Sequence, residues 1–108
     1  MDILLIEPDL YVAVPRKEFL EKCGYSVGIA GEIDEAVNVL KTCGGVRLVI
    51  IHYLMPRMFL QCLKSGREGF HSIILSEFPL EKYEADAAMV EPVEDDQLFR
   101  QVAVLLAH

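Results

Sequence analysis

Residues 48–56 read LVIIHYLMP, and this stretch decides the fold. Its first four residues, Leu48 to Ile51, are apolar at every position, which is typical of a central strand of a parallel sheet that is covered on both faces. His52 follows directly, so a polar side chain stands at the carboxyl end of the predicted strand. The stretch therefore predicts an α/β protein built on a parallel sheet.

Strand-like and helix-like segments alternate on both sides of this run. Strands are predicted at residues 3–6, 25–30, 48–51, 72–75 and 87–90. Helices are predicted at residues 15–23, 32–42, 58–64, 79–85 and 94–107, of which 79–85 has room for only one or two turns. Since crossovers between parallel strands are right-handed, this alternation predicts one doubly wound five-stranded sheet of order 2-1-3-4-5 with helices on both faces.

Pro15 and Gly24 set the limits of the first predicted helix. Proline has no backbone N–H and fits the first helical position, so the helix is predicted to begin at Pro15 and not at Leu10. Glycine is a common residue directly after a helix, so the helix is predicted to end at Gly24. The residues predicted to face inward are Val14, Phe19, Leu20 and Cys23.

Length and composition predict one domain over residues 1–108. No apolar run approaches the roughly 20 residues of a membrane-spanning helix. The N-terminus lacks the pattern of a signal peptide, so a cytoplasmic location is expected. Cys23, Cys43 and Cys62 show no CxxC or zinc-ligand spacing, and they are predicted to be small buried side chains.

The net charge of −7 is concentrated near the C-terminus, because residues 77–96 contain eight acids and one base. Such a face would repel nucleic acid and anionic membrane surfaces, so neither is an expected partner. A basic protein partner is expected. The alternative is a solvated face that only keeps the protein soluble.

Several stretches, in this order, resemble the receiver domain of bacterial two-component response regulators (CheY-like). The stretches are ILLIEPD at 3–9, FLEKCGYSV at 19–27, DEAVNVL at 34–40, LVIIHYLMPRM at 48–58, IILS at 73–76 and MVEP at 89–92. The resemblance covers essentially the whole chain. It implies the flavodoxin-like fold and a role in two-component signalling or a phosphorelay.

The phosphorylation residues of that family are largely replaced. His52 stands at the place of the phosphorylated aspartate, and Pro8 stands beside the retained Glu7 in the acidic pair that holds magnesium. Ser76 keeps the family's hydroxyl, and Glu91 replaces its lysine. Imidazole cannot form an acyl phosphate, and the charges that would stabilise the phosphoryl group are missing. Neither a bound metal nor a cofactor is expected.

The family's switch aromatic is replaced by Ala88, and the connection from Ser76 to Glu91 is shortened, chiefly in the fourth helix. Candidate partner-contact residues in this connection are Phe78, Pro79, Leu80 and Tyr83. They are apolar or aromatic and flanked by acids, which is typical of an interface. A second copy of the chain is an alternative partner, and a role in capping the core is an alternative to binding.

Within the replaced pocket, protonated His52 is predicted to pair with Glu91, Glu7 or both. The alternative is an ordinary hydrogen bond from a half-exposed histidine. The favoured function is a phosphorylation-independent pseudo-receiver that binds proteins and is not an enzyme. The rival is a hydrolytic or metal-binding protein that uses Glu7, His52, Ser76 and Glu91.

Overall fold

A computed structural model of the protein describes residues 1–52, 69–80 and 85–107. Five parallel strands form one sheet in the order β2-β1-β3-β4-β5, so the predicted sheet order is confirmed. The strands are β1 (Ile3–Ile6), β2 (Val27–Ala30), β3 (Leu48–His52), β4 (His71–Ser76) and β5 (Ala87–Val90).

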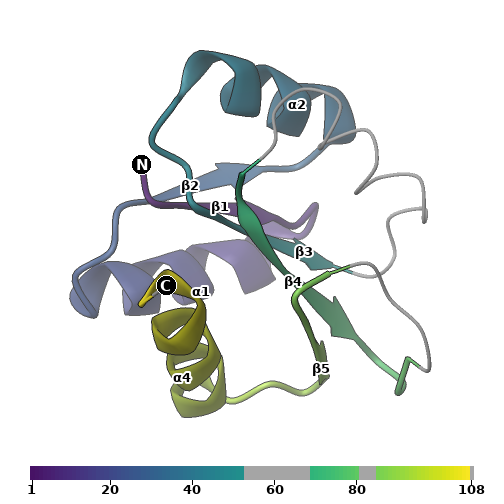
Figure 1. The fold of residues 1–108 in the computed structure, drawn as a ribbon. Helices are drawn as coiled ribbons and strands as arrows, with labels where there is room; N and C mark the ends of the chain where they lie inside the picture. Colours follow the sequence, from purple (N-terminus) through teal and green to yellow (C-terminus); the bar gives the residue numbers. More distant parts are fainter. Residues whose placement is uncertain (53–68, 81–84, 108) are drawn as a thin grey trace.

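The described helices cover both faces of this sheet, as predicted. They are α1 (Leu10–Lys22), α2 (Ile33–Thr42) and α4 (Asp95–Leu106). Figure 1 shows α1 and α4 on one face and α2 on the other. The helix predicted at 58–64 lies outside the described residues. Of the segment predicted as a short helix at 79–85, residues 79, 80 and 85 are not helical and the others are not described.

The sheet separates two apolar cores. Ile3 and Leu5 of β1 belong to the core beneath α1 and α4, while Leu4 and Ile6 belong to the core beneath α2. This alternation follows from the opposite directions of successive side chains in a strand. Because both faces are covered, every residue of β1 is buried. The uninterrupted apolar run of β3 has the same cause.

Helix α1 begins at Leu10, so the predicted start at Pro15 is wrong. Asp9 caps the helix, and its Oδ1 accepts a hydrogen bond from the backbone N–H of Tyr11 at 2.9 Å. Pro15 inside the helix cannot donate to the carbonyl of Tyr11. That carbonyl lies in an exposed first turn where water can solvate it, since Tyr11 is 94% exposed. The cap therefore allows the helix to begin at Leu10, before the proline.

The earlier start of α1 changes which of its residues face the sheet. Ala13 and Leu20 are buried, and Phe19 packs against the same core. Val14 is 40% exposed, so its predicted inward position is wrong.

The ends of α1 and α2 hold the described cysteines. Gly24 follows α1 with a φ of 100°, which confirms the predicted stop because glycine adopts this left-handed conformation without strain. Cys23 and Cys43 are the C-terminal caps of α1 and α2 and are only half-buried. The prediction of small buried cysteines is therefore not met by these two, which are half-buried, and Cys62 lies outside the described residues. Among the described helices, none combines the length and the hydropathy needed to cross a membrane.

Candidate functional site

The candidate site lies where the parallel strands end. Glu7 follows β1 and His52 ends β3. On the neighbouring strands, Ser76 ends β4 and Glu91 follows β5, where its backbone N–H donates to the carbonyl of Ser76 at 2.6 Å. The fold thus places these side chains at the carboxyl edge of the sheet, where ligands bind in many sheets of this kind.

Glu7 and His52 form the buried part of this site. Their side chains are 5% and 14% exposed, and 3.9 Å separates Glu7 Oε2 from His52 Nδ1. This distance fits an ion pair but is too long for a hydrogen bond. Glu7 Oε2 accepts no hydrogen bond within the described part of the chain.

The environment of Glu7 acts against its ionised form. Burial raises the pKa of the Glu7 carboxyl above its ordinary value, and the charges of His52 and Arg16 only partly oppose this effect. Asp9 and Glu91 raise the pKa further through repulsion. Because a buried charge lacks solvation, the carboxylate of Glu7 destabilises the folded protein at neutral pH.

Replacing this carboxylate with a neutral amide should therefore stabilise the protein. We expect Glu7→Gln to raise the free energy of unfolding at pH 7 by about 1 kcal/mol, the order of the penalty for an unpaired buried polar group. The difference should vanish below about pH 4, where the wild-type glutamate is protonated in the folded and the unfolded states. Urea unfolding at several pH values measures it.

The matched control for this measurement is Glu18→Gln at an exposed position of α1, which should change stability by less than about 0.5 kcal/mol. A loss of stability in Glu7→Gln at pH 7 would show that the attraction to His52 outweighs the cost of burial.

Glu91 has a different partner, which the sequence reasoning missed. Arg16 Nη2 lies 3.5 Å from Glu91 Oε1, with side-chain exposures of 10% and 20%. Glu91 Oε2 also accepts a hydrogen bond from the backbone N–H of Val93 at 3.3 Å. Of the predicted partners of His52, the structure pairs it with Glu7 and turns Glu91 toward α1. The signal was present in the sequence, since Arg16 lies three residues after Ala13 and four before Leu20, on the helix face that meets the core.

The Arg16–Glu91 ion pair should contribute to stability. Arg16→Gln should lower the free energy of unfolding by about 1–3 kcal/mol, because it leaves a half-buried carboxylate without its cation. Chemical denaturation measures the loss. Lys17→Gln is the control, because Lys17 forms a more exposed pair with Glu21. That substitution should have an effect of at most about 0.5 kcal/mol. Equal losses in the two variants would contradict a special role of Arg16.

The hydrolytic alternative does not fit the hydroxyl of Ser76. Ser76 is buried, and its Oγ donates to the carbonyl of Phe78 at 2.7 Å and accepts from the N–H of Phe78 at 3.2 Å. The hydroxyl proton of Ser76 is therefore donated to the backbone carbonyl of Phe78. A nucleophilic serine would instead donate this proton to a base such as His52.

The residues present do not fit a metal either. No three His, Cys, Asp or Glu side chains among the described residues are arranged to hold an ion. Glu91 is held by Arg16 instead of joining Glu7 and His52. Pro8 adds no ligand, and magnesium prefers oxygen ligands to imidazole. The metal-binding alternative is therefore not assembled in this part of the chain.

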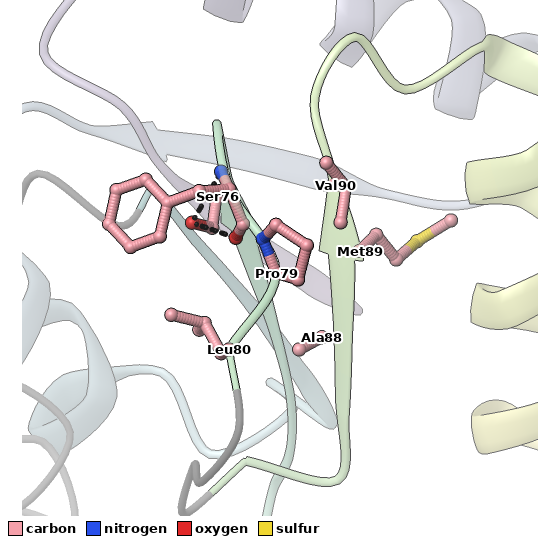
Figure 2. Close-up of a pocket in the computed structure, with 7 residues that line it drawn as sticks. Ser76, Pro79, Leu80, Ala88, Met89 and Val90 are labelled. Carbon is pink, nitrogen blue, oxygen red and sulfur yellow. Dashed lines mark hydrogen bonds between the residues drawn. The ribbon is translucent and has the colours of Figure 1, made fainter.

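Next to Ser76, a cavity of about 240 Å³ opens between β5 and the segment that follows β4. Its lining residues, shown in Figure 2, are Ser76, Phe78, Pro79, Leu80, Ala88, Met89 and Val90. Phe78 and Val90 are 52% and 48% exposed. Three of the four predicted contact residues thus line one cavity with the predicted switch position, Ala88. Tyr83 lies outside the described residues.

A scan against protein-family models and a search of the curated proteins found no match. Solved structures do match. The chain is similar to a CheY-like response regulator receiver domain protein from Methanospirillum hungatei JF-1, with 21% identity, a TM-score of 0.87 and coverage of 98% of this chain and 93% of that one. It is also similar to a two-component response regulator from Clostridium difficile, with 16% identity, a TM-score of 0.88 and coverage of 100% and 97%.

A third similar structure is a probable two-component response regulator/GGDEF domain protein, at 20% identity and a TM-score of 0.84. The match covers 99% of this chain and 49% of that longer one. These likenesses extend over nearly the full chain at high structural similarity and low sequence identity. The chain therefore has the fold of CheY-like response-regulator receiver domains.

Proposed function

We propose that the protein is a pseudo-receiver, a regulatory module of a two-component-like system that binds other proteins and does not accept a phosphoryl group. One observation carries this proposal: the charges at the carboxyl edge are inverted relative to what phosphoryl transfer needs. His52 stands where the nucleophile would be, and Glu91 brings a negative charge to the place of the lysine. An acyl phosphate forming there would meet carboxylates where it needs cations.

Contacts between side chains of the site support a constant conformation. Glu7 with His52 and Arg16 with Glu91 connect β1, β3, α1 and the segment after β5 without a phosphoryl group. Ala88 offers no aromatic ring that could change position in response to one. A module of this kind acts through the partner that it binds, and not through catalysis.

The proposed binding surface is the cavity beside β5. Phe78 and Pro79 line it and are exposed, and exposed apolar groups of this kind are typical of protein interfaces. Glu77 and Asp86 are exposed nearby in the chain, which favours a basic partner. A second copy of the chain is the alternative partner.

Pull-down from the native host tests this function. The wild type should capture the same partner with or without prior incubation with acetyl phosphate and magnesium. Phe78→Ser should reduce capture by at least about tenfold, the expected effect of losing an interface anchor. Val104→Ser is the control, because Val104 is 56% exposed on α4. Capture that requires acetyl phosphate would refute the proposal.

A further inference from the structure

In the part of the chain that the structure describes, no strand pairs with the outer edge of β5. In the described residues, β5 pairs with β4 on one side and is the last strand of the sheet. The N–H of Glu91 donates to Ser76 of β4. Since alternate residues of a strand point their backbone groups to the same side, Met89 also faces β4. Ala88 and Val90 therefore direct their N–H and C=O groups away from the sheet.

The cavity adjoins this edge. Ala88 and Val90 have side chains on one face of β5, and both line the cavity with Phe78 and Leu80. Figure 2 shows Ala88 on the side of the strand toward Pro79 and Leu80, and Met89 on the other side. An extended segment laid along β5 would place every second side chain on the face of the sheet that carries the cavity, because side chains alternate with a period of two.

The negative charge around the outer edge of β5 favours a basic segment as its partner. The exposed acids of the surrounding chain are Glu77, Asp86, Glu94, Asp95 and Asp96. Within the described residues 77–80 and 85–99 there is no lysine or arginine. Arg16, on the facing helix α1, is paired with Glu91, and Arg100 follows this stretch on α4. The field at this edge therefore attracts a segment with basic side chains.

From these observations we propose that β5 receives an extended basic segment of the partner as a sixth strand. Apolar side chains at alternate positions of this segment enter the cavity, and lysine or arginine side chains between them face the acids. Backbone hydrogen bonds to Ala88 and Val90 supply affinity, and the cavity and the charge supply specificity. This inference rests on the proposed function, because it names the class of partner for the same surface.

Binding of a synthetic peptide tests the inference. The probe is an eight-residue peptide of alternating valine and lysine with blocked ends. Fluorescence anisotropy measures its binding, and NMR measures hydrogen exchange at the amides of Ala88 and Val90. We expect saturable binding that weakens as salt increases and protects both amides from hydrogen exchange. The same peptide with N-methyl groups on alternate backbone nitrogens should bind at least about tenfold more weakly, since it cannot pair along one edge.

Substitutions at Val90 provide the matched test on the protein. Val90→Pro removes the outward N–H without touching the pairing with β4, a position where an edge strand tolerates proline. It should weaken binding at least about tenfold, while Val90→Thr, which keeps the N–H and the shape, should bind like the wild type. If Val90→Pro does not fold, the comparison of the methylated and unmethylated peptides on the wild-type protein still tests the inference. Equal binding of the methylated and unmethylated peptides would overturn the inference.

Two other outcomes would also overturn it. Complete absence of peptide binding would do so, as would dimerisation of the chain alone that Val90→Pro abolishes, since a second copy would then occupy the edge. Neither result bears on phosphorylation. The proposed function fails separately, when partner capture depends on acetyl phosphate.

Discussion

The triple variant Pro8→Asp, His52→Asp, Glu91→Lys should be phosphorylated by acetyl phosphate in the presence of magnesium, whereas the wild type should not. The three substitutions return the carboxylate nucleophile, the second acidic residue and the cation that the resemblance to receivers implies. Removal of one preorganised charge-stabilising group lowers a rate by about 10²–10³. Because each group acts on the same developing charge, all three should be needed. Phosphorylation is measured by intact-protein mass spectrometry.

The control for this prediction is the single variant His52→Asp. It has a nucleophile but still lacks the second acid and keeps Glu91, so its rate should be at least about 10³-fold below that of the triple variant. In the triple variant Arg16 also loses its partner, because lysine replaces Glu91. A triple variant that folds normally and is not phosphorylated would show that the replaced residues are not what prevents the reaction.

Ile50→Ala should lower the free energy of unfolding by about 2–5 kcal/mol, the range for truncating an isoleucine in a packed core. Ile50 lies on the central strand β3, is fully buried, and packs in the core between the sheet and the helices α1 and α4. Neighbours on a rigid strand cannot close the resulting cavity. Urea unfolding followed by circular dichroism measures the loss.

Two variants calibrate this result. Ile50→Val removes one methylene at the same position and should cost about 0.5–1.5 kcal/mol. Val104→Ala removes an apolar side chain from an exposed position of α4 and should have an effect within about 0.5 kcal/mol. A loss of less than about 1 kcal/mol in Ile50→Ala would contradict the packing described for β3.

The architecture could be predicted because it depends on patterns that every strand repeats. Residues 48–51 are apolar throughout, and parallel strands require covered faces, so the class and order of the sheet followed from a few runs. The start of α1 could not be predicted from Pro15 alone. Capping by Asp9 and the exposure of Tyr11 in the first turn explain that boundary, and both are properties of the folded chain.

The candidate site was predictable to the extent that it follows from strand ends. Glu7, His52, Ser76 and Glu91 each follow or end a strand, and parallel strands end at one edge. The partners of these side chains depend on helix rotation instead. Arg16 reaches Glu91 because it lies on the face of α1 that carries the buried residues Ala13 and Leu20. The local sequence does not determine where a helix crosses the sheet.

Intact-protein mass spectrometry of the wild-type chain after incubation with acetyl phosphate and magnesium examines the inverted-charge pocket most directly. With His52, Pro8 and Glu91 in place, the mass should stay that of the unmodified chain at every time point. A species heavier by one phosphoryl group, dependent on magnesium and absent from the unfolded protein, would contradict the account.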